Sequence, residues 1–413
     1  MGMRLDVEFY NDEERDLLKL NYPREFEKLE KIVEKGYVIV PFSDFKTYSQ
    51  MHHRNPSLSK LNSFNSIQGN VGDLYGNVNF YTQFDQETGR FYAEYSTVNE
   101  QNHVSESIGC GGALSVLGSA YGLTQADWQR IDIQNHKDFD FDSAVIDDFS
   151  KMIVIESKGS IVEDNTIKEK VSSHKNKIKK KKRDAEFKKK YEKGTDLLIG
   201  LITVVDTINH TKVLLVDPPA ESNQSDMFRF KIKVLKRLIF YFDWMSIISS
   251  RSYLSITLNN RIRVLKKLED IRILDLVELT NTDGELLKLK ENFIKTKSHI
   301  DEEIVGRLHI INEKKAVFIG LHVEIYNHVA SQDFFSISKF KTNTYIKTGR
   351  INLKLSRLKA ESANFIKNIT IEYRKGSSEL IHFNVNDAMI FQNSAGLVYS
   401  ILTNKNNYSI LNE

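Results

Sequence analysis

Hydrophobic and polar positions change their spacing several times along this chain, and the changes predict a mixed α/β architecture. Apolar residues at helical spacing (Phe26, Leu29 and Val33) follow Pro23 and stop before Gly36, which predicts a helix that ends at the glycine. Short apolar runs bounded by polar residues predict strands at 37–40, 139–146, 152–156, 197–205 and 212–216. A helix with an Asn11–Glu14 capping pattern precedes them.

Residues 102–121 combine an apolar character with four glycines, Gly109, Gly111, Gly112 and Gly118. Each glycine lowers helix propensity by about 1 kcal/mol relative to alanine. We nevertheless predict a helix here, because a helix of small residues can pack closely against a sheet.

The remaining pattern divides the chain into three regions. Alternation at 78–84 and 90–97 around a DQETG turn predicts a hairpin, and the segment 54–77 is rich in Asn, Ser and Gly, which indicates a loop. We predict an N-terminal α/β region at 1–98, a core at 99–220 and a C-terminal α+β domain at 221–413. The last is expected to be helical over 226–300 and strand-rich over 301–413, with helices at 228–248 and 260–268 and strands at 316–321, 351–355, 369–373 and 380–385.

Composition narrows the class of protein. The 413 residues are 40% hydrophobic and 27% charged, with a net charge of +3, as in an ordinary globular protein. The longest apolar runs, such as 197–205, are far shorter than the ~20 residues of a membrane helix. The N-terminus has no secretory pattern, and the single cysteine, Cys110, suits a reducing compartment. We therefore expect a cytoplasmic protein with no membrane association and with Cys110 in the core.

Candidate chemistry is concentrated in residues 136–160, HKDFDFDSAVIDDFSKMIVIESKGS. Side chains of a strand alternate between its two faces, so Asp138, Asp140 and Asp142 share one face, as do Glu156 and Lys158. If the two strands pair antiparallel, with Asp147 and Asp148 in the turn, their carboxylates and the lysine form one cluster. Carboxylate oxygens bind Mg²⁺, and the metal activates water for attack on a phosphate. The backbone carbonyl of Ser157 adds a further candidate metal ligand.

This arrangement resembles the PD-(D/E)XK nuclease superfamily, whose fold is restriction-endonuclease-like. The family pattern is matched by Asp142 and by Glu156-Ser157-Lys158, with Glu156 fourteen residues after Asp142. A looser resemblance extends over about 100–217. It implies a core of a mixed sheet flanked by helices. It also implies that Asp142 and Glu156 bind the metal and that Lys158 orients or activates the attacking water. Because Phe141 rather than proline precedes Asp142, Asp140 is kept as the second candidate aspartate.

Many members of the family carry a further metal-binding glutamate on the first core helix. Glu106 is the candidate by resemblance; the alternative is an acidic residue placed by the dipole at a helix N-terminus.

A lysine-rich segment follows the candidate site. Residues 168–193 contain thirteen Lys or Arg against four Asp or Glu. Such a run either contacts nucleic-acid phosphates or forms a solvated insertion. The residues assigned to phosphate contact are Lys175, Lys177, Lys179, Lys180, Lys181, Lys182 and Arg183. A second basic stretch, 228–242, is expected to be an amphipathic helix with a charged outer face, and lining a nucleic-acid groove is the alternative.

The sequence predicts a nuclease that depends on Mg²⁺ or Mn²⁺. Its expected substrate is DNA, and RNA is the alternative substrate. By analogy, the expected biological setting is restriction or anti-phage defence. The expected partners are a second copy of this chain in a homodimer, further copies in a larger homo-oligomer, or a partner protein of a defence system. Two alternatives stay open. One is a non-catalytic nucleic-acid-binding module on the same fold. The other is a metal-dependent transferase that uses DFDFD to bind a nucleotide sugar.

Overall fold

The chain folds into two compact units, Met1–Lys233 and Val234–Glu413, which we describe separately. The structure is a computed structural model and describes residues 2–49, 81–95, 102–131, 140–144, 151–183, 197–216, 226–249, 253–268, 294–297, 303–312, 315–355 and 381–403.

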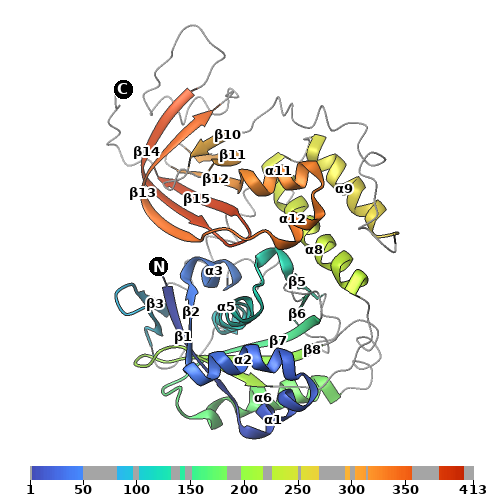
Figure 1. The fold of residues 1–413 in the computed structure, drawn as a ribbon. Coiled ribbons are helices and arrows are strands. Elements are labelled where there is room, and N and C mark those ends of the chain that lie inside the picture. Colours follow the sequence, from blue (N-terminus) through green and yellow to red (C-terminus); the bar gives the residue numbers. More distant parts are fainter. Residues whose placement is uncertain are drawn as a thin grey trace. The chain divides into compact units, whose positions relative to one another are not determined.

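The first unit is built on a seven-stranded mixed sheet with the order β2-β1-β9-β8-β7-β6-β5 (Figure 1). β1 runs parallel to β9 and β7 runs parallel to β8, whereas the other neighbouring pairs are antiparallel. Its strands are β1 (Gly2–Phe9), β2 (Tyr37–Pro41), β5 (Gln129–Arg130), β6 (Phe141–Ala144), β7 (Met152–Ile161), β8 (Leu197–Val205) and β9 (Lys212–Val216). A separate hairpin consists of β3 (Thr82–Asp85) and β4 (Arg90–Ala93).

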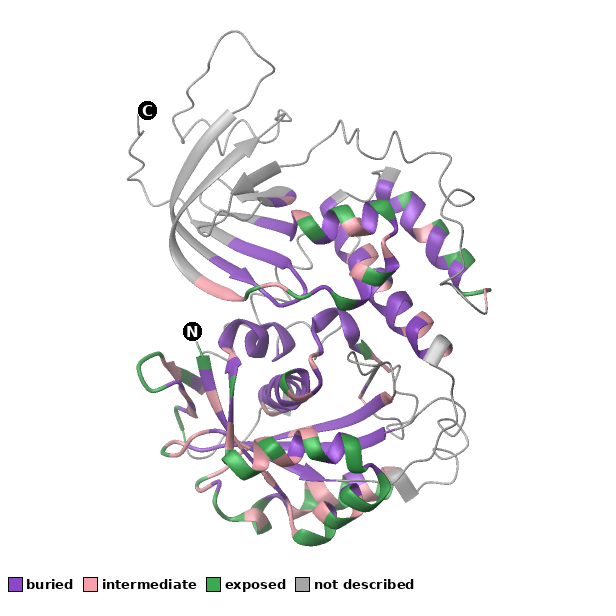
Figure 2. Ribbon diagram, viewed as in Figure 1, coloured by how far each residue is buried: buried purple, intermediate pink, exposed green. Residues whose placement is uncertain are grey.

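Helices cover both faces of this sheet, so the predicted α/β class is confirmed. On β8, Thr203 contacts α5 while Gly200 contacts α6, and residues separated by an odd number of positions point to opposite faces. Figure 2 shows that α5 is buried along most of its length. The helices of the unit are α1 (Asp12–Asn21), α2 (Pro23–Lys35), α3 (Phe42–Thr47), α5 (Asn102–Tyr121), η3 (Gln125–Asp127), η4 (Lys168–Val171) and α6 (Ser172–Arg183).

Local signals explain how the N-terminal helices begin and end. The side chain of Asn11 accepts a hydrogen bond from the Glu14 N–H at 3.0 Å and caps α1, as predicted. Pro23 begins α2 and Gly36, with a φ of 78°, ends it in the left-handed conformation. The preceding strand β1 was not predicted. Its alternating buried residues, Met3, Leu5, Val7 and Phe9, place it inside the sheet.

The glycines of α5 bring this helix onto the sheet, as expected from its composition. An added Cβ on Gly109 would lie 2.6 Å from the backbone nitrogen of Gly159 in β7, and one on Gly112 would overlap Thr203 in β8. The Thr203 hydroxyl also donates a hydrogen bond to the Gly109 carbonyl at 3.3 Å. α5 therefore packs directly against the strand that carries Glu156 and Lys158.

The two predicted domain boundaries differ from the division in the structure. The boundary between 98 and 99 falls inside the first unit, because β1 and β2 belong to the same sheet as β7, β8 and β9. The boundary between 220 and 221 lies outside the described residues. The two units divide inside α8 (Asp226–Ser249), between Lys233 and Val234.

The second unit combines helices with a closed barrel of strand order β10-β11-β12-β15-β14-β13. Neighbouring strands of the barrel are antiparallel. Its strands are β10 (Ile294–Lys297), β11 (Glu303–Asn312), β12 (Lys315–His322), β13 (Tyr345–Leu355), β14 (Ile381–Gln392) and β15 (Leu397–Thr403), and its further helices are α9 (Tyr253–Leu265), α11 (Val323–Ser331) and α12 (Phe334–Lys339).

The prediction that the basic residues of α8 form a charged outer face is wrong. Arg229, Lys233, Lys236 and Arg237 are all buried. Within the second unit, the Arg237 guanidinium donates to the carbonyls of Ile337 and Phe340 at 2.7 and 2.9 Å. These carbonyls, together with Asp127 for Lys233, account for two of the basic residues on this buried helix.

Some predictions fall outside the described residues. These are the loop at 54–77, the turn with Asp147 and Asp148, the strand at 369–373, and Asp138.

Candidate active site

The central strand β7 carries the E-x-K sequence next to the end of β6. Glu156 and Lys158 alternate with Ile155, Ser157 and Gly159 along this strand, and Gly159 faces α5. Because side chains alternate between faces, Glu156 and Lys158 point to the other face, where α6 lies (Figure 1). The sheet therefore separates the packing face of β7 from its polar face.

Glu156 is a fully buried carboxylate with two cationic neighbours. Its side chain is 0% exposed, and its Oε1 forms ion pairs with Lys158 and with Lys181 of α6, the latter at 2.6 Å. Its Oε2 is buried and has no hydrogen-bond partner in the part of the chain that the structure describes. Among the described residues, neither carboxylate oxygen accepts a hydrogen bond of ordinary geometry, and Oε1 alone is held by ion pairs.

Burial and charge shift the ionisation of both residues of the motif. Burial, together with the charge of Asp140, raises the pKa of Glu156 to about 7, although Lys158 and Lys181 lower it. Burial alone would lower the pKa of Lys158, but the charges of Glu156 and Asp140 outweigh this effect and raise the pKa above its ordinary value. Lys158 is therefore a stable ammonium group at neutral pH.

Asp140, which immediately precedes β6, is held against β7 by Ser157. Its Oδ2 accepts hydrogen bonds from the Ser157 N–H and from the Ser157 hydroxyl, both at 3.0 Å. The N–H and C=O of one strand residue point to the same side, so the Ser157 carbonyl is directed toward β6 as well. This orientation is compatible with the predicted ligand role of that carbonyl, which stays a prediction.

The structure places the other sequence candidates as follows. Asp142 pairs through its backbone with Val154, two residues before Glu156, and its side chain lies outside the described residues. Glu106 is exposed near the start of α5, and its charge contributes to the raised pKa of Lys158. Asp140 and Lys158 therefore lie close to Glu156 in the middle of β7, and the charge of Glu106 reaches Lys158 from α5.

The basic residues of α6 separate into different environments. Lys179 pairs with Glu14 of α1 at 2.6 Å, and Lys175 lies 3.7 Å from the same carboxylate. Lys177 and Lys180 are exposed, whereas the side chains of Lys182 and Arg183 are outside the described residues. Only part of the predicted phosphate-contacting run is therefore directed to solvent, and Lys181 is directed to Glu156.

The structure places His174 of α6 beside the site, close enough for the charge of Lys158 to act on it. It lies one turn before the buried Ile178 on α6, and its Nδ1 is buried with no hydrogen-bond partner among the described residues. Burial, followed by the charges of Lys177 and Lys158, lowers the pKa of His174 to about 4. The spacing of His174, Ile178 and Lys181 at i, i+4 and i+7 was the available signal for this inward face.

The oxygen donors beside Glu156 of β7 fit a hard divalent cation. In the described part of the chain the buried Oε2 of Glu156 has no hydrogen-bond partner, and Ser157 fixes Asp140 close to this carboxylate. Mg²⁺ is usually bound by one or two carboxylates together with water and substrate phosphate, rather than by a complete protein cage. No group of three or more His, Cys, Asp or Glu side chains that could hold a metal occurs within the described ranges.

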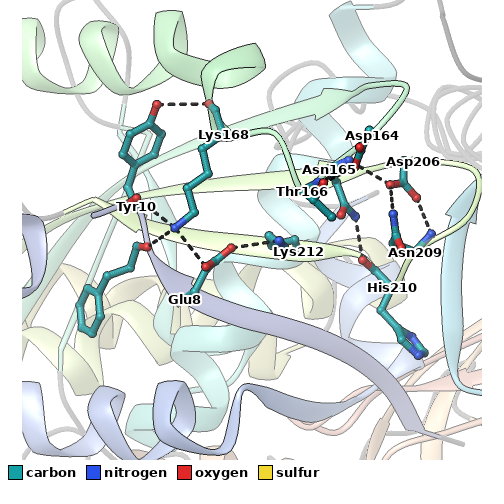
Figure 3. Close-up of polar contacts among 11 residues, drawn as sticks. Glu8, Tyr10, Asp164, Asn165, Thr166, Lys168, Asp206, Asn209, His210 and Lys212 are labelled. Atoms are coloured by element: carbon teal, nitrogen blue, oxygen red, sulfur yellow. Dashed lines mark hydrogen bonds and ion pairs between the residues drawn. The ribbon is translucent and has the colours of Figure 1, made fainter. Parts of the chain in front are cut away.

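A second polar cluster on the same sheet has a structural role (Figure 3). Lys168 donates hydrogen bonds to the carbonyls of Phe9 and Tyr10 at 3.0 and 3.1 Å and pairs with Glu8, which also pairs with Lys212. Burial would raise the pKa of Glu8, but hydrogen bonds from the two lysines lower it. The cluster attaches the segment before α6 to β1, and both of its lysines pair with the one carboxylate of Glu8.

Comparisons with protein-family models, with curated proteins and with solved structures find no match to this chain. Within the described residues, no helix is both long enough and apolar enough to span a membrane.

Proposed function

We propose that the first unit is a metal-dependent nuclease that hydrolyses phosphodiester bonds, with DNA as the expected substrate. The observation that carries the proposal is the buried Glu156, with Asp140 and Lys158 beside it in the middle of the inner strand β7. The order of α5, β6, β7, α6 and β8 also follows the helix, strands, helix and strand order of the PD-(D/E)XK core. The resemblance and the geometry thus support the same function.

Each residue has a role that follows from its position. Asp140 and Glu156 hold the cation, with the Ser157 carbonyl, Asp142 and Glu106 as further candidate ligands. Mg²⁺, or Mn²⁺, supplies charge stabilisation at the phosphate and a more acidic water when bound. Lys158, as an ammonium group, donates hydrogen bonds that orient the water and offset negative charge in the transition state.

The reaction balances without a further reactant. The oxygen of water forms a bond to phosphorus while the bond from phosphorus to the leaving ester oxygen breaks. The water loses one proton to solvent, and the leaving oxygen gains one from solvent. The products are a phosphate monoester and an alcohol.

A direct test measures cleavage of supercoiled plasmid, linear duplex, single-stranded DNA and RNA in Mg²⁺ or in EDTA. Glu156→Gln removes the buried carboxylate, and Glu163→Gln is the control because Glu163 is exposed beyond the end of β7. We expect cleavage in Mg²⁺ by the wild type and Glu163→Gln, and none in EDTA or by Glu156→Gln. Equal cleavage by Glu156→Gln would contradict the proposed site.

The non-catalytic binding module is the second candidate, and the basic surface of α6 is the observation in its favour. Exposed Lys177 and Lys180 are suited to phosphate contacts. This function needs no buried carboxylate with an adjacent lysine. It predicts salt-sensitive binding by every variant and no cleavage by the wild type.

A further inference from the structure

α6 presents one lysine to the candidate site and its other described lysines elsewhere. Lys175 and Lys179 are directed to Glu14 of α1, and Lys177 and Lys180 are exposed. Lys181 follows the buried Ile178 by three positions, its side chain is 16% exposed, and its Nζ lies 2.6 Å from Glu156 Oε1. The position of Lys181 is therefore set by the packing of Ile178 against the sheet.

Lys158 and Lys181 share the same carboxylate oxygen. A divalent cation at Glu156 brings two positive charges next to two ammonium groups, which weakens the attraction of both lysines to this carboxylate. The ammonium groups then require other anionic partners. Lys158 already has the role of orienting water, whereas Lys181 has no role in the proposed function.

We propose that Lys181 binds the phosphate at which cleavage occurs. When metal and nucleic acid are present, its ammonium group moves from the Glu156 carboxylate to a phosphate oxygen. This inference rests on the proposed nuclease function and adds a phosphate-binding residue to it.

Charge balance supports this assignment. Asp140 and Glu156 together balance one divalent cation. The attacked phosphate gains negative charge on the way to the transition state, and Lys158 and Lys181 provide two positive charges for it. Fixed cations that face developing charge at a partly buried site stabilise the transition state more than they stabilise the ground state.

The test compares Lys181→Gln with Lys181→Arg and with two controls at exposed lysines of other helices, Lys19→Gln on α1 and Lys31→Gln on α2. Cleavage of plasmid and of a fluorescein-labelled DNA duplex in Mg²⁺ gives kcat and KM separately. Isothermal titration with Mn²⁺ alone measures the metal affinity, and thermal unfolding confirms that each variant is folded.

We expect Lys181→Gln to lower kcat by about tenfold to a hundredfold, Lys181→Arg to recover part of it, and both controls to cleave like the wild type. Mn²⁺ affinity should be unchanged or higher in Lys181→Gln, because an ammonium group that competes for Glu156 has been removed. A purely structural role for Lys181 would instead weaken Mn²⁺ binding and cleavage together, and that result would overturn the inference.

The two proposals fail in different ways. Wild-type cleavage with an unchanged kcat in Lys181→Gln would overturn the role of Lys181 alone. Absence of metal-dependent cleavage by the wild type would overturn the nuclease function and the role of Lys181 with it.

Discussion

Gly109 of α5 and Gly159 of β7 meet through their backbones, one residue beyond Lys158. An added Cβ on Gly159 would lie 2.6 Å from the Gly109 nitrogen and would overlap the Ser105 carbonyl. The helix N-terminal region, which carries Glu106, is thereby held close to the strand that carries Glu156. The glycine after the E-x-K sequence is thus part of the construction of the site.

Gly159→Ala should therefore lower the free energy of unfolding by about 3 kcal/mol, because the helix must move to admit a methyl group against backbone atoms. Chemical denaturation measures the change. Gly118→Ala is the control, since its nearest atom would be the Leu123 carbonyl oxygen at 3.1 Å, and we expect a change below about 1 kcal/mol. Equal stability of Gly159→Ala and the wild type would show that this close contact is absent.

Asp140 should be more important than Asp142 for metal binding. Ser157 fixes Asp140 through two hydrogen bonds at 3.0 Å, close enough for its charge to affect Glu156. In a Mn²⁺ titration, Asp140→Asn should bind the metal at least about tenfold more weakly than the wild type. Ser157→Ala removes one of the two hydrogen bonds and should lose less Mn²⁺ affinity. A larger loss in Asp142→Asn than in Asp140→Asn would assign the ligand to Asp142.

Lys233 and Asp127 form a buried ion pair of 2.5 Å, and both side chains are 0% exposed. Asp127 also accepts hydrogen bonds from the Thr124 N–H and hydroxyl. Lys233→Met leaves this carboxylate buried beside an apolar group and should cost about 3 kcal/mol of unfolding free energy.

The matched control for that pair is Lys231→Met, at a half-buried position of the same helix. We expect a change below about 1 kcal/mol there. The double variant Asp127→Asn with Lys233→Met should lose less than the sum of the two single changes. Strict additivity would mean that the pair is not coupled.

His174 should make stability depend on pH. Burial and the charges of Lys177 and Lys158 depress its pKa from 6.5 to about 4, so the unfolded chain binds more protons between these values. The stabilisation is fully present above pH 6.5 and is lost as pH falls toward 4. Urea unfolding should show a steeper loss of stability in this range for the wild type than for His174→Gln. Parallel pH profiles would contradict the depressed pKa.

Periodicity and capping signals were sufficient to predict most helices and strands of the first unit. The sequence also predicted that α5 packs closely, because its four glycines have no other advantage in a helix. The pairing of β1 with β9 could not be predicted, since local patterns contain no information on which distant strands become neighbours. The N-terminal alternation of Met3, Leu5, Val7 and Phe9 was the signal for the strand itself.

The charged residues were harder to assign than the apolar ones. Lys233 and Arg237 are buried because an aspartate and backbone carbonyls from distant segments meet them. Likewise, the partner of each lysine on α6 depends on its helix face. Lys181 pairs with Glu156 and Lys180 is exposed, a difference that only the folded structure reveals. Candidate residues such as Glu156 and Lys158 could be named from sequence because their spacing lies within one strand.

The most direct measurement compares DNA cleavage and DNA binding by the wild type and by Lys158→Ala, under single-turnover conditions with Mg²⁺. The control is Lys151→Ala, one residue before β7. We predict that Lys158→Ala binds a labelled duplex within a few-fold of the wild type and cleaves it at least about a hundredfold more slowly. Lys151→Ala should cleave normally. Binding without metal-dependent cleavage by the wild type, or equal cleavage by Lys158→Ala, would contradict a nuclease site at Glu156 and Lys158.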